Sequence, residues 1–136
     1  MQDKQQITTE LNNALDTEIT RIFLSVGMPS KIKGYRFLRE AVKIAYFDVS
    51  SLECMGSGIY DKIAVRFDAL NGKAVERTCS YAIELASNSG KMVNLNQLVG
   101  VKLYADRNEK PSAGEFIALI ADLLRVKNKF AHANFI

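Results

Sequence analysis

The sequence has few of the residues that build metal centres, disulfide frameworks or catalytic sites. It contains two cysteines, Cys54 and Cys79, and one histidine, His132. Their spacing matches neither a zinc site nor a disulfide framework, and Cys79 lies on an apolar helical face that suits a small core side chain. A lone histidine near the end of a chain is more often inert than catalytic. We therefore expect no metal ion and no cofactor.

Long apolar runs and phosphate-binding loops are also missing. No stretch reaches the roughly 18 apolar residues of a membrane span, and residues 1–16 lack the apolar centre of a signal peptide. We expect a cytoplasmic protein without a membrane partner. Residues 56–58 (GSG) are too short for a phosphate-binding loop and lack its lysine. Acidic residues are scattered, with no apolar surround that would shift a pKa, so the chain is not expected to be an enzyme.

What the sequence does have is helical periodicity across most of its 136 residues, enough for one domain with a real core. We predict an all-α fold, a compact bundle of about six helices. Residues 1–16 are expected to be a polar linker or an N-terminal helix, residues 17–130 the folded domain, and residues 131–136 a tail. Thr17 is a candidate N-cap for a helix that ends at Gly27. The net charge of +3 permits an anionic partner without requiring one.

The stretch from Ile59 to Gly90 is the centre of the prediction. A short helix with an apolar stripe is followed by turn residues 68–72 and a longer helix from Lys73. The first stripe consists of Ile59, Ile63 and Phe67, and the buried face of the second helix consists of Val75, Cys79, Ala82, Ile83 and Ala86. Its opposite face carries Lys73, Glu76, Arg77, Ser80, Tyr81 and Glu84. Such a pair is typical of a helix-turn-helix, whose second helix enters a DNA major groove, although any helical hairpin in a small bundle looks similar.

The most basic stretch precedes this hairpin. A helix is predicted from about Gly34 to Tyr46, with a core stripe of Tyr35, Leu38, Val42, Ala45 and Tyr46. Its other side and the residues before it carry five cations, Lys31, Lys33, Arg36, Arg39 and Lys43, against one anion, Glu40. Two interpretations remain open: a surface for the phosphate backbone of DNA, or an ordinary solvated helix face.

Two weaker helix signals follow the hairpin. Residues 94–97 have the spacing of a weak capping box, which predicts a short helix that stops at Gly100, and residues 101–104 look extended. Residues 106–110 form a polar loop. A clearer capping box at Ser112 and Glu115 begins a final helix with a broad apolar face. That face consists of Phe116, Leu119, Ile120, Leu123 and Leu124.

Several short motifs occur together, in an order and at a spacing typical of one family. They are Val26-Gly27-Met28-Pro29, Ile32-Lys33-Gly34-Tyr35, Leu38-Arg39-Glu40-Ala41, Ile63-Ala64, Val75-Glu76-Arg77, Ala82-Ile83-Glu84, Lys110-Pro111-Ser112, Glu115-Phe116-Ile117-Ala118 and Ala121-Asp122. Over about residues 18–127 the chain resembles the effector domain family of stage zero sporulation protein A, a response-regulator transcription factor of endospore-forming bacteria. The resemblance implies a bundle of about six helices that binds a short DNA box as a tandem dimer and normally follows a phosphoacceptor receiver domain.

The resemblance also implies which residues meet DNA. The helix that opens at Lys73 would be the reading helix, and Glu76 and Arg77 match family positions that read base edges. The expected reading surface also includes Lys73, Ser80 and Tyr81. The Lys73 ammonium group and the hydroxyl groups of Ser80 and Tyr81 would approach DNA phosphates. Lys31, Lys33, Arg36 and Arg39 would hold the flanking phosphate backbone.

The chain departs from the family pattern within this helix. Family arginines are replaced by Ala74 and Ser80, and a family histidine by Tyr81. Because one bidentate arginine–guanine contact contributes about 1–3 kcal/mol of discrimination, these losses should weaken or redirect specificity. The leading hypothesis is a sequence-specific DNA-binding transcription regulator domain, with double-stranded DNA as partner and a homodimer on tandem sites. Its rival is a divergent relative that acts through protein contacts, for example with RNA polymerase or a full-length homologue.

Overall fold

Six α-helices make up most of the part of the chain that the structure describes. The computed structural model describes residues 4–104 and 109–133, and side chains within 9–104 and 109–129. The helices are α1 (Lys4–Ser25), α2 (Lys33–Phe47), α3 (Asp61–Arg66), α4 (Gly72–Asn88), α5 (Asn94–Val99) and α6 (Ala113–Ala133), with a 3-10 turn η1 (Val49–Glu53) and a π-helical turn η2 (Gly56–Tyr60). Neither described segment contains a strand, so the predicted all-α bundle is confirmed. No helix in these segments is long and apolar enough to cross a membrane.

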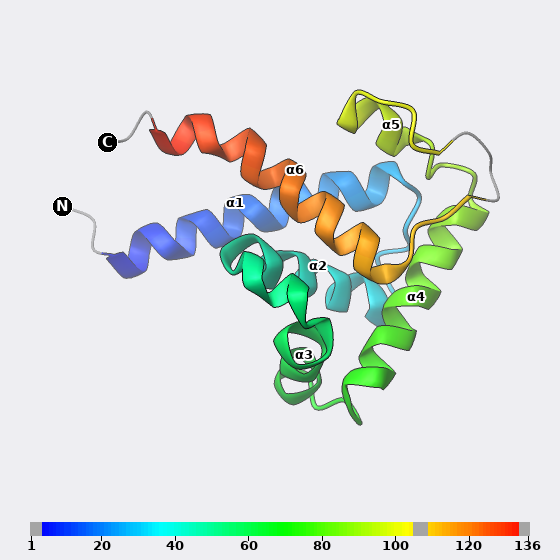
Figure 1. Cartoon of the computed structure of the whole chain (residues 1–136), viewed down its shortest axis with the longest axis horizontal. Coiled ribbons are helices and arrows are strands. Elements are labelled where there is room, and N and C mark those ends of the chain that lie inside the picture. Colours follow the sequence, from blue (N-terminus) through cyan, green and yellow to red (C-terminus); the bar gives the residue numbers. More distant parts are fainter. Residues whose placement is uncertain (1–3, 105–108, 134–136) are drawn as a thin grey trace.

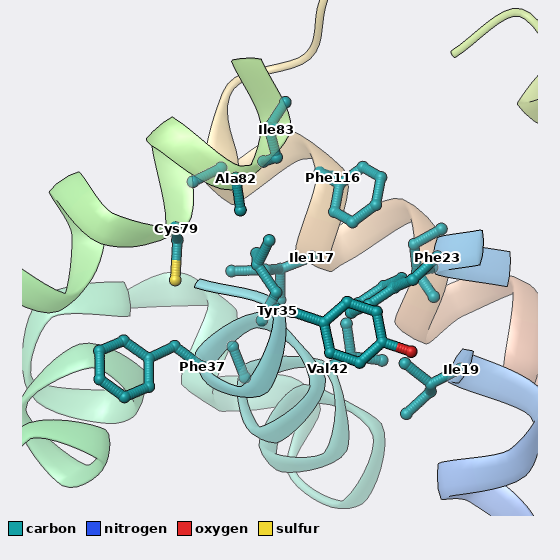
Figure 2. Packing of buried hydrophobic residues seen from close by; sticks show 14 of the residues in the cluster. Ile19, Phe23, Tyr35, Phe37, Val42, Cys79, Ala82, Ile83, Phe116 and Ile117 are labelled. Atoms are coloured by element: carbon teal, nitrogen blue, oxygen red, sulfur yellow. The ribbon is translucent and has the colours of Figure 1, made fainter. Parts of the chain in front are cut away.

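Helix α2 lies at the centre of the bundle, where it packs against both α4 and α6 (Figure 1). The five residues of its predicted stripe are all buried. Tyr35 makes an edge-to-face contact with Phe23 of α1 at 5.3 Å between ring centroids, and Phe23 in turn meets Phe116 of α6 at 5.5 Å (Figure 2). Each fully buried side chain of this kind contributes roughly 1.5–3 kcal/mol. Side chains from four helices therefore share one core.

Gly34 lets α2 and α4 approach until their backbones nearly touch. A Cβ atom at Gly34 would lie 2.5 Å from the carbonyl oxygen of Thr78 and 2.7 Å from the Cβ of Ala82, both on α4. Neither neighbour is the tip of a flexible side chain, so no larger residue fits without moving a helix. The glycine of the Lys33-Gly34-Tyr35 motif thus sets the distance between the central helix and α4.

Helix α1 is longer than predicted, and the expected cap at Thr17 is wrong. The helix runs without interruption from Lys4 to Ser25, and the Thr17 hydroxyl donates to the carbonyl oxygen of Asn13 at 3.1 Å within it. The turns before Thr17 are held by the body of the protein, since Leu15 is 1% exposed and Asp16 forms ion pairs with α2. This packing extends the helix past a residue that locally favours a start.

The ends of the last two helices differ in how they match the sequence. Helix α5 stops at Gly100 as predicted, with a left-handed φ of 87°. The weak capping box at Asn94 is wrong, because Val93 precedes the helix and the Asn94 amide instead donates to the carbonyl oxygen of Ser25 at 2.6 Å. The box at Ser112 is confirmed as a cap, since its hydroxyl accepts the backbone N–H of Glu115 at 3.2 Å.

Candidate nucleic-acid interface

The connection between α3 and α4 has the geometry of a tight helical turn. Helix α3 ends when the backbone N–H of Ala69 bonds to the carbonyl oxygen of Ala64 at 2.8 Å, with Asp68 left-handed at φ 55°. This six-residue hydrogen-bonded turn at a helix end usually has glycine in the left-handed position, which Asp68 occupies here. Helix α4 then begins with Asn71, whose side-chain oxygen accepts the N–H of Ala74 at 2.9 Å. The direction of α4 is thus fixed by a backbone hydrogen bond before the turn and a side-chain cap after it.

A second close approach sets the angle between the two helices. A Cβ atom on Gly72, the first residue of α4, would lie 2.2 Å from Oδ1 and 3.2 Å from the backbone nitrogen of Asp61, the first residue of α3. The start of α4 therefore rests directly on the start of α3. The Asp61 carboxylate also lies beside the N-terminus of α4, where the helix dipole favours a negative charge.

The predicted buried face of α4 is confirmed. Val75, Cys79, Ala82, Ile83 and Ala86 are at most 1% exposed. In Figure 2 Cys79, Ala82 and Ile83 line one side of the core, and the Cys79 sulfur points inward toward α2 and Phe37. Burial raises the pKa of the Cys79 thiol to about 12. Cys79 is a packing residue rather than a nucleophile, as its place in the pattern suggested.

The first predicted stripe is buried only in part. Ile59 and Ile63 have no exposed surface, whereas Phe67 is 37% exposed and lies beside Phe37, with ring centroids 5.5 Å apart. Phe67 follows the last residue of α3, so its side chain no longer lies on the buried face of that helix. Residues 59–60 also belong to the π-helical turn η2, which precedes α3.

The opposite face of α4 forms an exposed ridge that we call the α4 ridge, made of Lys73, Glu76, Arg77, Ser80, Tyr81 and Glu84. No described side chain forms an ion pair with Glu76 or Arg77. Tyr81 is 55% exposed. Charged and hydroxyl groups along a helix whose other side is anchored in the core are available to an external partner. Ala74, one of the departures from the family pattern, is partly buried beside the ridge.

A shallow groove of about 380 Å³ runs between the α4 ridge and the segment that leads into α6. One wall carries Arg77, Ser80, Tyr81 and Glu84, and the other carries residues 110–113. Lys110 in that segment is exposed and adds a cation beside the ridge. The sequence pattern predicts no role for Lys110, although it stands in the Lys110-Pro111-Ser112 motif. Only the fold shows that this segment borders α4.

The basic stretch of α2 divides into two groups. Lys31, Lys33 and Arg36 are exposed. Arg39 and Lys43 face Asp16 of α1, whose Oδ1 atom is 3.8 Å from Arg39 Nε and 3.1 Å from Lys43 Nζ. The five cations of this stretch therefore face a second anion besides Glu40, because Asp16 on α1 lies beside two of them.

A further ion pair links the same region to α3. Arg66 pairs with Glu40, which also lies 3.8 Å from Lys43 Nζ. Arg39 in addition stacks over the ring of Tyr35 at 5.7 Å. The charged groups on this side of α2 thus connect three helices, and only its N-terminal part presents cations free of described ion pairs.

No group of three or more histidine, cysteine, aspartate or glutamate residues that could hold a metal ion occurs within the described segments.

Residues 19–124 match the family described as "Sporulation initiation factor Spo0A C terminal". The match contains α2 to α5 whole, together with most of α6 and the last turns of α1, so it includes the turn, the α4 ridge and the basic stretch. The chain belongs to this family of helical DNA-binding effector domains.

Proposed function

We propose that the chain is a sequence-specific transcription regulator domain that reads the major groove of DNA with the α4 ridge. The observation that supports it best is the pair Glu76 and Arg77. Both are exposed and unpaired among the described side chains, on a helix that the turn and the core hold rigidly. An arginine so placed can donate two hydrogen bonds to a guanine, and a glutamate can accept one from a cytosine amino group.

The phosphate contacts of the proposal come from two segments that pack close to α4. Gly34 brings the start of α2 against Thr78 and Ala82, and the exposed Lys31 and Lys33 precede it in the chain. Lys110 lies across the groove from Arg77. Cations on segments beside a reading helix suit the phosphates that border a major groove. Arg36 extends the first group, whereas Arg39 contributes less because Asp16 already neutralises part of its charge.

Within the ridge, the remaining residues have supporting roles. Lys73 lies in the first turn of α4, where its ammonium group can reach a phosphate, and the hydroxyl groups of Ser80 and Tyr81 can do the same further along. Because Ala74 and Ser80 replace family arginines, we expect a preferred sequence different from the one that arginines would select. Tyr81 replaces the ring nitrogens of the family histidine by a phenolic hydroxyl, which changes the hydrogen bonds available at that position.

Selection of bound duplexes from a random library tests the proposal. We expect one sequence class to be enriched, and Arg77→Ala to weaken binding to it by about 1–3 kcal/mol. The matched control is Arg21→Ala, which removes another exposed cation, from α1, and should change affinity only slightly. Enrichment of no duplex at low salt would refute the proposal.

The rival function is regulation through protein contacts, for example with RNA polymerase or a full-length homologue. The two lost arginines favour it, as does an apolar groove formed by Leu11, Tyr46, Phe47 and Val126 with Arg125 and Lys129 at its edge. A substitution such as Val126→Asp would then impair regulation without changing affinity for a duplex. If Arg77→Ala alone abolishes regulation, DNA binding is the function that matters.

A further inference from the structure

Leu70, in the turn before α4, is an aliphatic side chain left almost entirely in water. It is 89% exposed, and the only described large apolar residue of comparable exposure is Val65 of α3, at 85%. An exposed leucine gains almost no stability from the hydrophobic effect, because folding removes little of its surface from water. Leu70 occupies a turn position that polar residues usually take, and its side chain is free to contact an external partner.

Leu70 does not make the contact that is usual for an apolar residue just before a helix. Leu70 immediately precedes the N-cap residue Asn71, and such a residue commonly packs against the fourth residue of the helix. In α4 that residue is Val75, which has no exposed surface and packs in the core. With 89% of its surface exposed, Leu70 does not make this contact. The hydrogen bonds that close α3 and cap α4 hold the turn so that Leu70 projects from the start of the helix.

The start of the second helix is the part of a helix-turn-helix that comes closest to the base edges. Leu70 lies there, three residues before Lys73, and its side chain is exposed to solvent. The major groove offers one apolar group, the 5-methyl group of thymine, and aliphatic side chains recognise it by contact. We propose that Leu70 is a specificity-determining residue that contacts the methyl group of a thymine at one end of the DNA site. This inference rests on the proposed function.

Replacing thymine by uracil tests the contact, because uracil lacks only that methyl group. In the duplex selected from the random library, each thymine is replaced in turn, and affinity is measured for the wild-type protein and for Leu70→Ala. We expect one replacement to weaken wild-type binding about three- to tenfold, the effect of losing one apolar contact. Leu70→Ala should bind the thymine duplex more weakly by a similar factor and should no longer distinguish thymine from uracil at that position.

Val65→Ala is the matched control, since Val65 is about as exposed but stands on α3. It should retain the wild-type preference for thymine, and if it loses that preference the assignment to Leu70 is wrong. Wild-type and Leu70→Ala proteins that respond alike to every uracil replacement also overturn the inference and leave DNA binding intact. Unchanged affinity of Leu70→Ala for all duplexes would likewise overturn the inference. If the wild-type protein binds no duplex, both proposals fail together.

Discussion

Asp16 of α1 lies 3.1 Å from the ammonium group of Lys43 on α2 and joins the first helix to the centre of the bundle. The Lys43 side chain is only 15% exposed, and Oδ1 of Asp16 is buried with no regular hydrogen bond. Each group has one further ion-pair partner, but both of these lie farther away, at 3.8 Å. We expect Asp16→Asn to lower the free energy of unfolding by about 1 kcal/mol, between the values for surface and buried pairs. Urea denaturation at pH 7 measures the free energy of unfolding of the wild type and of the variant.

Glu18→Gln is the control for that experiment. It removes the same charge from the same helix, but its partner Lys127 is 61% exposed. A loss below about 0.5 kcal/mol is expected for such a pair. Equal losses for the two variants would show that the Asp16 pair has no special role.

Gly34→Ala should destabilise the domain by forcing α2 and α4 apart. The added methyl group would meet the Thr78 carbonyl and the Ala82 Cβ at distances that real side chains do not show. Overpacking of this kind costs about 1–3 kcal/mol, measured as a shift of the urea midpoint. Gly56→Ala is the matched control, because a Cβ at Gly56 has nothing within 4 Å. A midpoint for Gly34→Ala no lower than that of the control would contradict the close approach.

The salt dependence of DNA binding should distinguish the two groups of cations on α2. Lys33→Ala is expected to reduce the slope of log affinity against log salt by about 0.9, the value for one lost phosphate contact. Arg39→Ala should change it less, because the Asp16 carboxylate lies beside the guanidinium group. Fluorescence anisotropy over a salt series measures both slopes. A larger change for Arg39→Ala would mean that Arg39 leaves Asp16 when DNA binds.

The two cysteines should differ sharply toward a thiol reagent. Cys54 is exposed, and a hydrogen bond with the Ser57 hydroxyl at 3.0 Å lowers the pKa of its thiol, whereas Cys79 is buried. At pH 8 we expect one thiol to react rapidly and the second only after unfolding in denaturant. Cys54→Ser removes the rapid phase and serves as the control. Rapid reaction of both thiols in the native protein would show that the α4 face is not packed as described.

Alkaline pH should weaken the fold through Cys79. Its pKa in the folded protein is about 12, raised by burial from the ordinary value of 9.0, so above pH 9 the unfolded chain loses its proton while the folded protein keeps it. The free energy of unfolding should be unaffected below pH 9 and fall as pH rises toward 12, by up to about 1.4 kcal/mol per pH unit from this group. Burial raises the pKa of Tyr60 as well and adds to the loss. Denaturation of the wild type and of Cys79→Ala at pH 8 and 10 separates the cysteine contribution.

Local pattern was enough to predict much of this molecule. The two faces of α4, the stripe of α2 and the stop of α5 at Gly100 all follow from residue types within a turn or two of each other. These features depend on spacing along one helix, which the sequence displays directly. The exposure of Glu76 and Arg77 followed from the same spacing, because the core had to lie on the other side.

What the sequence could not show depends on contacts between distant segments. Thr17 looks like a helix start locally, yet Leu15 and Asp16 pack on other helices and carry the helix through it. The pairing of Arg39 with Asp16 and the placement of Lys110 beside Arg77 likewise require the fold. The roles of the ridge residues toward DNA remain proposals, since their partner is outside the chain.

The uninterrupted length of α1 has a mechanical consequence. At 22 residues it is about 33 Å long, and Figure 1 shows its first turns reaching well away from α3 and α4. Helix α1 is anchored mainly through its later turns. A small tilt of the bundle would therefore become a larger displacement at the N-terminal end of α1. A spectroscopic label near that end would therefore register docking far more sensitively than one placed inside the bundle.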